Sequence, residues 1–320
     1  MLKTLIKTFL KLSVAFALIY WLLKSGKLDL NLIAELGKNP WGLLAAFTLA
    51  LTNIWIISIR WRGILEARNS VHIPLLGLVK ANWIGQFFSS VLPGSVTGDL
   101  IKIIYVQEYD KSISKKFVFA TILIDRVMGL SGLILLVGLT SVLFQDHILD
   151  NAPAMKPLLK FNYFLTALVL AGIIIFIFFD QFVHKVFRLG ERILFPAIWQ
   201  KFGDLWNDLI SIKVQILKAL CLSLVVQFSG VLIFWSLIYP FTLGKMDFVQ
   251  ALAFIPLGHM TLALPIAPSG LGVGHAIFQK LFEFSGITNG ASLFNLYFIV
   301  TLIINICGVV PYLLSRRNKA

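Results

Sequence analysis

Long apolar segments dominate the pattern of hydrophobic and polar positions along this chain. A helix needs about 20 mainly apolar residues to cross a lipid bilayer. Segments that approach or exceed this length lie at about 1–23, 41–58, 117–144, 161–179, 218–239 and 291–314. The pattern therefore predicts an all-α polytopic membrane protein with about six spanning helices.

Two further apolar stretches, 74–97 and 247–285, are interrupted in a way that a simple spanning helix is not. The interrupting residues are Pro93 and Gly94 in the first stretch, and Pro256, Pro265, Pro268, Gly270, Gly272 and Gly274 in the second. Non-helical backbone at membrane depth is tolerated only where it is buried in protein or lines a cavity. We therefore expect two re-entrant hairpins, each of which enters and leaves on one side of the membrane.

Clusters of Lys and Arg predict the orientation of these segments. The clusters are Arg60, Arg62 and Arg68; Lys111, Lys115 and Lys116; Lys185, Arg188, Arg192, Lys201 and Lys213; and Arg316, Arg317 and Lys319. Because cytoplasmic loops carry the excess of basic residues, these clusters and both termini are expected on the cytoplasmic side of the inner membrane. The two hairpins then open to opposite sides. Apolar residues interleaved with the charges of 180–217 predict an amphipathic helix on the inner surface.

The two halves of the chain, about 1–150 and 151–320, have the same order of segments in opposite orientation. Each half has two spans, a broken hairpin and a further span, which predicts an inverted repeat. Both hairpins contain the pattern Leu-Pro-x4-Gly, which ends at Gly98 in the first half and at Gly270 in the second. Interrupted segments at corresponding positions of two halves are a sequence indication of a transporter's binding site.

The composition supports the membrane class and excludes several others. Of 320 residues, 58% are hydrophobic and 13% are charged, whereas a soluble domain has about 25% charged residues. The net charge of +13 is explained by cytoplasmic loops near anionic lipid, so no nucleic-acid partner is expected. Cys221 and Cys307 lie in apolar runs and predict neither a disulfide framework nor a metal site. There is no Walker-type phosphate loop, and no cofactor is expected.

The first hairpin contains the best candidate for an anion site. A helix that starts near Gly98 would leave unpaired N–H groups at its first turn, and Lys102 follows one turn later. This arrangement suits a lipid phosphate. Asp99 would then be a ligand or, alternatively, the N-cap of the helix.

Other polar residues in the apolar segments are candidates with simpler alternatives. A charge at the membrane centre costs about 2.5–3.5 kcal/mol, so Asp125 and Arg126 are site candidates. Alternatively, Arg126 reaches the headgroups or pairs with Asp99. Arg60 could serve only as a positive-inside signal, and His275 could form a hydrogen bond between helices.

Several of these residues together resemble a known family. The resemblance rests on Arg60-Trp61-Arg62, Asn82, Leu92-Pro93-Gly94 through Gly98-Asp99, Asp125-Arg126, and Leu264-Pro265 through Pro268-Ser269-Gly270-Leu271-Gly272. This combination is similar to the flippase-like family, the transmembrane region of lysylphosphatidylglycerol synthase. The resemblance covers almost the whole chain. It implies translocation of lipids with charged or glycan headgroups, such as aminoacylated phosphatidylglycerol.

The sequence also departs from the family pattern. Ser95 and Thr97 stand where Gly is common, Lys102 where Arg is common, and His275 where Glu is frequent. A phosphate site is still expected with these changes, whereas the identity of the headgroup and an acidic contact to an aminoacyl amine are left open. Larger members carry a soluble aminoacyl-transfer domain, and the chain ends at Ala320 without one. We therefore do not expect this chain alone to synthesise the lysyl-lipid, and we expect a transporter rather than an enzyme.

The resulting hypothesis is a lipid flippase that binds a phosphate-bearing headgroup in a central cavity. Its candidate binding residues are Arg60, Asn82, Pro93, Gly94, Gly98, Asp99, Lys102, Asp125, Arg126, Pro265, Ser269, Gly270, Gly272 and His275. The expected partners are anionic or polyprenyl-phosphate lipids and a separate lipid-modifying transferase. Alternatives are an accessory subunit that presents lipid to a transferase, an intramembrane enzyme with Asp99, Asp125 or His275 as acid and base, and a small-solute transporter.

Overall fold

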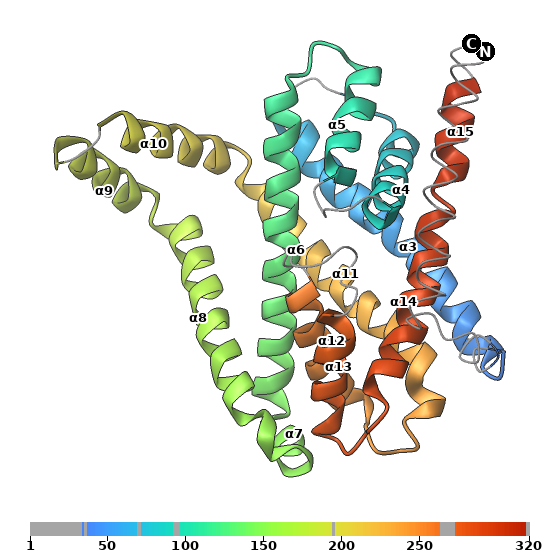
Figure 1. The fold of residues 1–320 in the computed structure, drawn as a ribbon. Coiled ribbons are helices and arrows are strands. Elements are labelled where there is room, and N and C mark those ends of the chain that lie inside the picture. The colour runs from blue at the N-terminus through green and yellow to red at the C-terminus, as the bar shows by residue number, and fades with distance from the viewer. Residues whose placement is uncertain are drawn as a thin grey trace.

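A computed structural model describes residue 34 and residues 37–68, 72–91, 97–193, 196–262 and 273–317. Within these ranges the chain is helical and has no strands, which confirms the all-α polytopic class (Figure 1). The helices long and apolar enough to span a membrane are α3 (Pro40–Leu65), α6 (Lys115–Leu143), α8 (Lys156–Phe178), α11 (Lys213–Ile238), and α14 (Gly290–Ile306) together with α15 (Val309–Arg317). The first predicted span, 1–23, lies outside the described residues.

The start of α3 shows how the spanning helices are tied together. Pro40 occupies the first turn, where its missing N–H and fixed backbone angle favour helix initiation. Asn39 is the N-cap, and its side-chain oxygen accepts a hydrogen bond from the Gly42 amide at 3.0 Å. The same side chain donates from Nδ2 to the Ser236 carbonyl at 2.8 Å. One Asn therefore caps α3 and fixes it to the far end of α11.

Short helices form two hairpins at opposite ends of the bundle. The first consists of α4 (Leu75–Val91) and α5 (Thr97–Tyr109), and the second of α12 (Phe248–Leu262) and α13 (Val273–Glu283). Figure 1 shows α4 and α5 near one end and α12 and α13 near the other. The sequence-based limit of 74–97 for the first hairpin is too short. Its second arm continues to Tyr109 because Lys102 and its neighbours form a regular helix rather than a loop.

The last span also differs from its predicted form. It is interrupted by a turn at Cys307 and Gly308, between α14 and α15. Pro311 explains the position of this break. A proline has no N–H to donate to the carbonyl four residues earlier, and its ring collides with that carbonyl. In α15 this carbonyl belongs to Cys307.

The loop 180–217 contains two amphipathic helices instead of the single one expected. They are α9 (Asp180–Ile193) and α10 (Pro196–Ser211), which project away from the bundle in Figure 1. Their contact includes Phe187 and Trp199, with ring centroids 6.2 Å apart. Apolar side chains at spacings of four and three residues also stay exposed: Phe182, Val186 and Leu189 on α9, and Ile198, Phe202 and Leu205 on α10.

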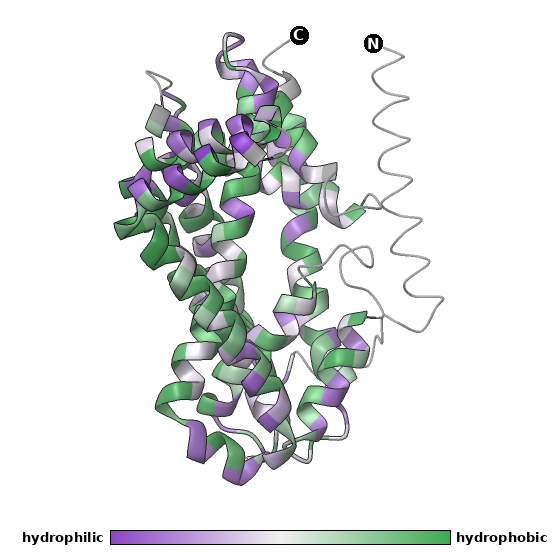
Figure 2. Cartoon of the chain, turned by 90° about the vertical axis from the view of Figure 1, so that its left-hand side faces the viewer, coloured by the Kyte–Doolittle hydropathy of each residue, from purple (hydrophilic) through white to green (hydrophobic). Residues whose placement is uncertain are grey.

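The remaining short elements lie between spans: η1 (Glu66–Arg68), α7 (Gln145–Asn151), η2 (Pro153–Met155) and η3 (Tyr239–Phe241). Hydrophilic residues gather mainly toward the two ends of the bundle, and hydrophobic residues line its middle (Figure 2). This distribution is the one expected for a body that crosses a bilayer.

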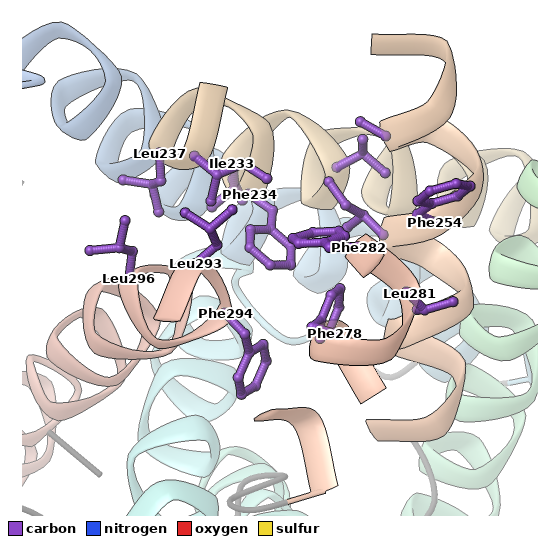
Figure 3. Close-up of a cluster of buried hydrophobic side chains, with 14 of the residues drawn as sticks. Ile233, Phe234, Leu237, Phe254, Phe278, Leu281, Phe282, Leu293, Phe294 and Leu296 are labelled. Atoms are coloured by element: carbon purple, nitrogen blue, oxygen red, sulfur yellow. The ribbon is translucent and has the colours of Figure 1, made fainter. Parts of the chain in front are cut away.

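Two apolar cores hold the hairpins in place. The first surrounds α4 and α5 and includes Trp61, Ile84, Phe87 and Phe88. The second surrounds α12 and α13, with Phe234 near its centre (Figure 3). The ring centroids of Phe234 and Phe278 are 4.8 Å apart in an edge-to-face contact, and Phe282, Phe294 and Tyr297 also touch Phe234.

We predict that Gly132→Leu destabilises the contact between α6 and α11. A Cβ at Gly132 would lie 2.8 Å from the Ser223 Cβ and 3.0 Å from its carbonyl carbon. Such overpacking costs about 1–3 kcal/mol, so thermal unfolding in detergent should begin at a lower temperature. The matched control is Gly172→Leu in α8, where an added Cβ meets nothing within 4 Å. Equal melting temperatures for the two variants would contradict the prediction.

Candidate functional site

A cavity of about 480 Å³ lies between the two cores. This volume falls in the range of small-molecule sites. Its lining comes from α3, α4, α5, α6, α11, α12 and α14. The polar lining residues are Asn53, Gln86, Ser89, Ser90, Asp99, Lys102, Asp125, Arg126, Tyr297, Thr301 and Asn305. The cavity thus brings together Asp99, Lys102, Asp125 and Arg126 from the predicted site.

Arg60 and Asp125 form a buried ion pair at the wall of this cavity. Arg60 Nε lies 2.7 Å from Asp125 Oδ1, and Nη2 lies 2.8 Å from Oδ2. Its remaining nitrogen, Nη1, donates to Ser223 Oγ at 2.9 Å. The side chains of Arg60 and Asp125 are only 6% and 11% exposed. A bidentate guanidinium–carboxylate pair of this kind has both strength and a fixed geometry.

Arg60 itself does not line the cavity. It lies in α3 behind Asp125 of α6, and Ser223 of α11 completes its contacts. Arg60 is therefore a positioning residue that holds the Asp125 carboxylate. A positive-inside signal alone would not explain why the Arg60 side chain is buried in this pair. The two residues of the pair are 65 positions apart in sequence.

Asp99 is the centre of a second charged group. Its Oδ2 lies 2.6 Å from Arg126 Nη2, and its Oδ1 lies 3.3 Å from Lys102 Nζ. Since α5 begins at Thr97, Asp99 lies within the first turn rather than at the N-cap. A carboxylate in that turn interacts favourably with the helix dipole. Lys102 also lies 5.7 Å from the centre of the Trp61 ring, within reach of a cation–π interaction.

Arg126 forms an ion pair with Asp99 and also lines the cavity. Its side chain is 41% exposed, whereas the side chains of Asp99 and Lys102 are 8% and 16% exposed. The alternative in which Arg126 pairs with Asp99 therefore holds. The pair does not remove the guanidinium from the cavity, which Arg126 still lines.

Two of the predicted site residues, Gly98 and Asn82, serve contacts between helices. A Cβ on Gly98 would collide with the Gly85 carbonyl oxygen and the Ser89 hydroxyl, so Gly98 allows α4 and α5 to approach closely. Asn82 is buried and donates a hydrogen bond from Nδ2 to Ser58 Oγ at 2.9 Å. Asn82 therefore joins α4 to α3 and does not reach the cavity.

His275 lies outside the cavity lining as well. One ring nitrogen is 3.2 Å from Asn295 Oδ1, which joins α13 to α14. This contact fits the alternative of a hydrogen bond between helices. Pro93, Gly94, Pro265, Ser269, Gly270 and Gly272 lie outside the described residues.

Sequence reasoning missed the uncharged polar residues of the cavity. Asn53 precedes Arg60 by two helical turns, so a helical-wheel analysis of α3 could have placed them on one face. The sequence gives no comparable signal for the other uncharged polar residues of the cavity. Asn305 donates to Ser90 Oγ at 2.9 Å across 215 positions, and nothing in the sequence brings those two segments together.

We predict that Asp125→Asn destabilises the protein by about 3–5 kcal/mol, because it leaves the Arg60 guanidinium buried without its counter-charge. Unfolding in detergent, followed by circular dichroism, would measure the loss. Arg60→Met combined with Asp125→Leu should be much less harmful, since the charge and its partner are removed together. The exposed Asp150→Asn is the control for loss of a carboxylate. If the double variant lost as much stability as Asp125→Asn, the pairing would not be the cause.

Comparisons to known proteins identify the family of this chain. The sequence model of a family described as the lysylphosphatidylglycerol synthase TM region matches residues 8–313. UPF0104 membrane protein PH1989 of Pyrococcus horikoshii is 20% identical to this chain over 266 residues, which is 77% of each chain. No solved structure matches the chain. The family match covers nearly the whole sequence, and the chain belongs to the family of the lysylphosphatidylglycerol synthase transmembrane region.

Proposed function

We propose that this protein binds the phosphate of a lipid headgroup in the central cavity and moves the lipid between the two leaflets. The observation that carries the proposal is the cavity itself, because residues from both halves and both hairpins line it. A polar, charged cavity inside an apolar body suits a headgroup whose acyl chains remain in the bilayer. A charged residue within a membrane segment is by default a sign of function.

The packing of the helices supports an inverted repeat, a fold that serves alternating access in many transporters. If α3, α4, α5 and α6 correspond to α11, α12, α13 and α14, the contacts of the two sets match. For example, α3 packs on α4 and α14, and α11 packs on α12 and α6. Similarly, α6 touches α12, and α14 touches α4. The cavity then lies where the two repeats meet.

Lys102 and Arg126 are the groups that would hold the phosphate. Both line the cavity and both already contact a carboxylate oxygen of Asp99. The first-turn amides of α5 add donors of the same polarity. Arg suits phosphate because its planar donors can bind two oxygens at once. With no nucleotide motif in the sequence, a lipid or ion gradient would drive net transport.

The proposed protein lies in the inner membrane with a defined orientation. Both termini and the α9–α10 hairpin would lie on the cytoplasmic side of the inner membrane, because their sequences carry clusters of Lys and Arg, which are typical of cytoplasmic segments. The α4–α5 hairpin would enter and leave from the cytoplasm, and the α12–α13 hairpin from the outside. No chemical change to the lipid is required.

The orientation can be tested by labelling single cysteines in intact cells. With Cys221 and Cys307 replaced by Ser, Lys111→Cys should react with a membrane-impermeant maleimide only after the cells are opened. Lys245→Cys should react in intact cells. Reaction of both residues from the same side would contradict the inverted repeat.

Lipid binding and movement can be tested with the purified protein in vesicles. Vesicles that contain phosphatidylglycerol and a fluorescent phosphatidylglycerol would report transfer between leaflets, and native mass spectrometry would report the lipid retained. We expect Arg126→Gln to lower retention by roughly 10- to 100-fold, since a hydrogen bond to a charged group contributes about 1.5–3 kcal/mol.

Lys160→Gln in α8 is the matched control, because Lys160 is exposed and lies outside the cavity lining. Equal lipid retention by Arg126→Gln and this control would contradict the phosphate site. Retention without transfer between leaflets would favour an accessory protein that presents lipid to a transferase. A chemically altered lipid would favour an intramembrane enzyme.

A further inference from the structure

We infer that the lipid bound in this cavity carries a single phosphate joined to an uncharged, hydroxyl-bearing group, and not a headgroup amine. The inference rests on the proposed function and concerns the same cavity. It follows from three features: both acids of the described lining are already paired, the charged cluster formed by these residues and Arg60 behind them is positive by one, and the second half contributes only uncharged residues to the described lining.

Both carboxylates of the described lining already have cationic partners. Asp125 is held by Arg60 through two contacts, at 2.7 and 2.8 Å. Asp99 lies between Arg126 and Lys102. A lipid ammonium would have to displace one of these partners, and the displaced cation would then be left partly buried without a counter-charge. For the buried Arg60–Asp125 pair, removing one partner costs about 3–5 kcal/mol.

The charges of this cluster also favour an anion. Arg60, Lys102 and Arg126 supply three positive charges, whereas Asp99 and Asp125 supply two negative ones. The cluster therefore has one surplus positive charge. A phosphodiester carries one negative charge and would neutralise it, whereas a headgroup with an added ammonium would not.

The part of the lining that comes from the second half of the chain has different chemistry. Every charged residue of the described lining comes from α5 or α6, and the lining contributed by α11, α12 and α14 is uncharged. Its polar members are Tyr297, Thr301 and Asn305. Hydroxyl and amide groups of this kind bind the hydroxyls of a polyol and offer no counter-charge to an amine.

Asn53 supplies a specific acceptor on the α3 side. Its Oδ1 is buried and has no hydrogen-bond partner in the part of the chain that the structure describes. Its Nδ2 makes only a long contact of 3.5 Å with the Val226 carbonyl. A buried acceptor without a partner costs about 1–3 kcal/mol, and a ligand hydroxyl would remove that cost. Asn53 lines the same cavity as Lys102 and Arg126, so a hydroxyl and a phosphate of one headgroup could be bound together.

Three lipids with the same acyl chains separate the possibilities. Phosphatidylglycerol has a phosphodiester and hydroxyls, phosphatidylmethanol has the phosphodiester alone, and lysyl-phosphatidylglycerol adds amines. The purified protein would be equilibrated with equimolar mixtures in vesicles, and the lipids retained would be counted by native mass spectrometry. We expect phosphatidylglycerol to be retained roughly 10-fold over each of the other two, a ratio equivalent to about 1.4 kcal/mol.

Two variants connect this preference to the residues. Asn53→Leu keeps a similar volume and should lower the preference for phosphatidylglycerol over phosphatidylmethanol by roughly 2- to 10-fold, since one hydrogen bond contributes about 0.5–1.5 kcal/mol. Thr52→Leu is the matched control, because the exposed Thr52 hydroxyl donates to the Thr48 carbonyl of its own helix. This control should keep the full preference.

The outcomes distinguish this inference from the function on which it rests. If lysyl-phosphatidylglycerol is retained as well as phosphatidylglycerol and Arg126→Gln weakens both, the phosphate site stands and the polyol inference is wrong. The same conclusion follows if Asn53→Leu keeps the wild-type preference. If none of the three lipids is retained above the level of Arg126→Gln, the proposed function and the inference are both wrong.

Discussion

The structure depends on the burial of charge inside an apolar body, and the Arg60–Asp125 pair is its clearest instance. Neither group could remain charged alone at this depth without a large cost in solvation. Their pairing fixes α3 against α6, and the hydrogen bond from Arg60 to Ser223 adds α11. These contacts therefore fix how α3, α6 and α11 are rotated about their own axes. Without them, the similar apolar surfaces of the three helices would not specify one orientation. Asp99, Lys102 and Arg126 then complete a charged wall beside this fixed point.

Close packing at small residues provides the second constraint. Gly98 meets α4 at Gly85 and Ser89, and Gly132 meets α11 at Ser223, both without room for a side chain. Within a bilayer, helix association relies on such close contact and on hydrogen bonds, because lipid is as apolar as the side chains. The aromatic core around Phe234 plays the corresponding role for the second hairpin (Figure 3). Two separately packed cores leave the polar cavity between them.

The two proposed repeats share a packing scheme but not a chemistry. The charges of the described lining are confined to α5 and α6, while α14 contributes neutral polar groups and ends at the break before α15. The charged part of a lipid headgroup could contact α5 and α6, and its uncharged part could contact α14. According to this proposal, the arrangement of the helices provides the route of the lipid across the membrane, and the different residues of the two halves determine which headgroup is bound.

The sequence alone determined the membrane class, the approximate positions of the described spans and of the two helical hairpins, and the family, because each depends on the length of apolar segments or on local motifs. It also identified Asp99, Lys102, Asp125 and Arg126 as candidates, since charge in such segments is costly. Only the tertiary structure decided that Arg60 holds Asp125, that Asn82 and His275 join helices, and that Asn53 and Asn305 reach the cavity. The reason is physical: side-chain partners depend on how each helix is rotated, and apolar surfaces that face lipid or another helix have the same composition.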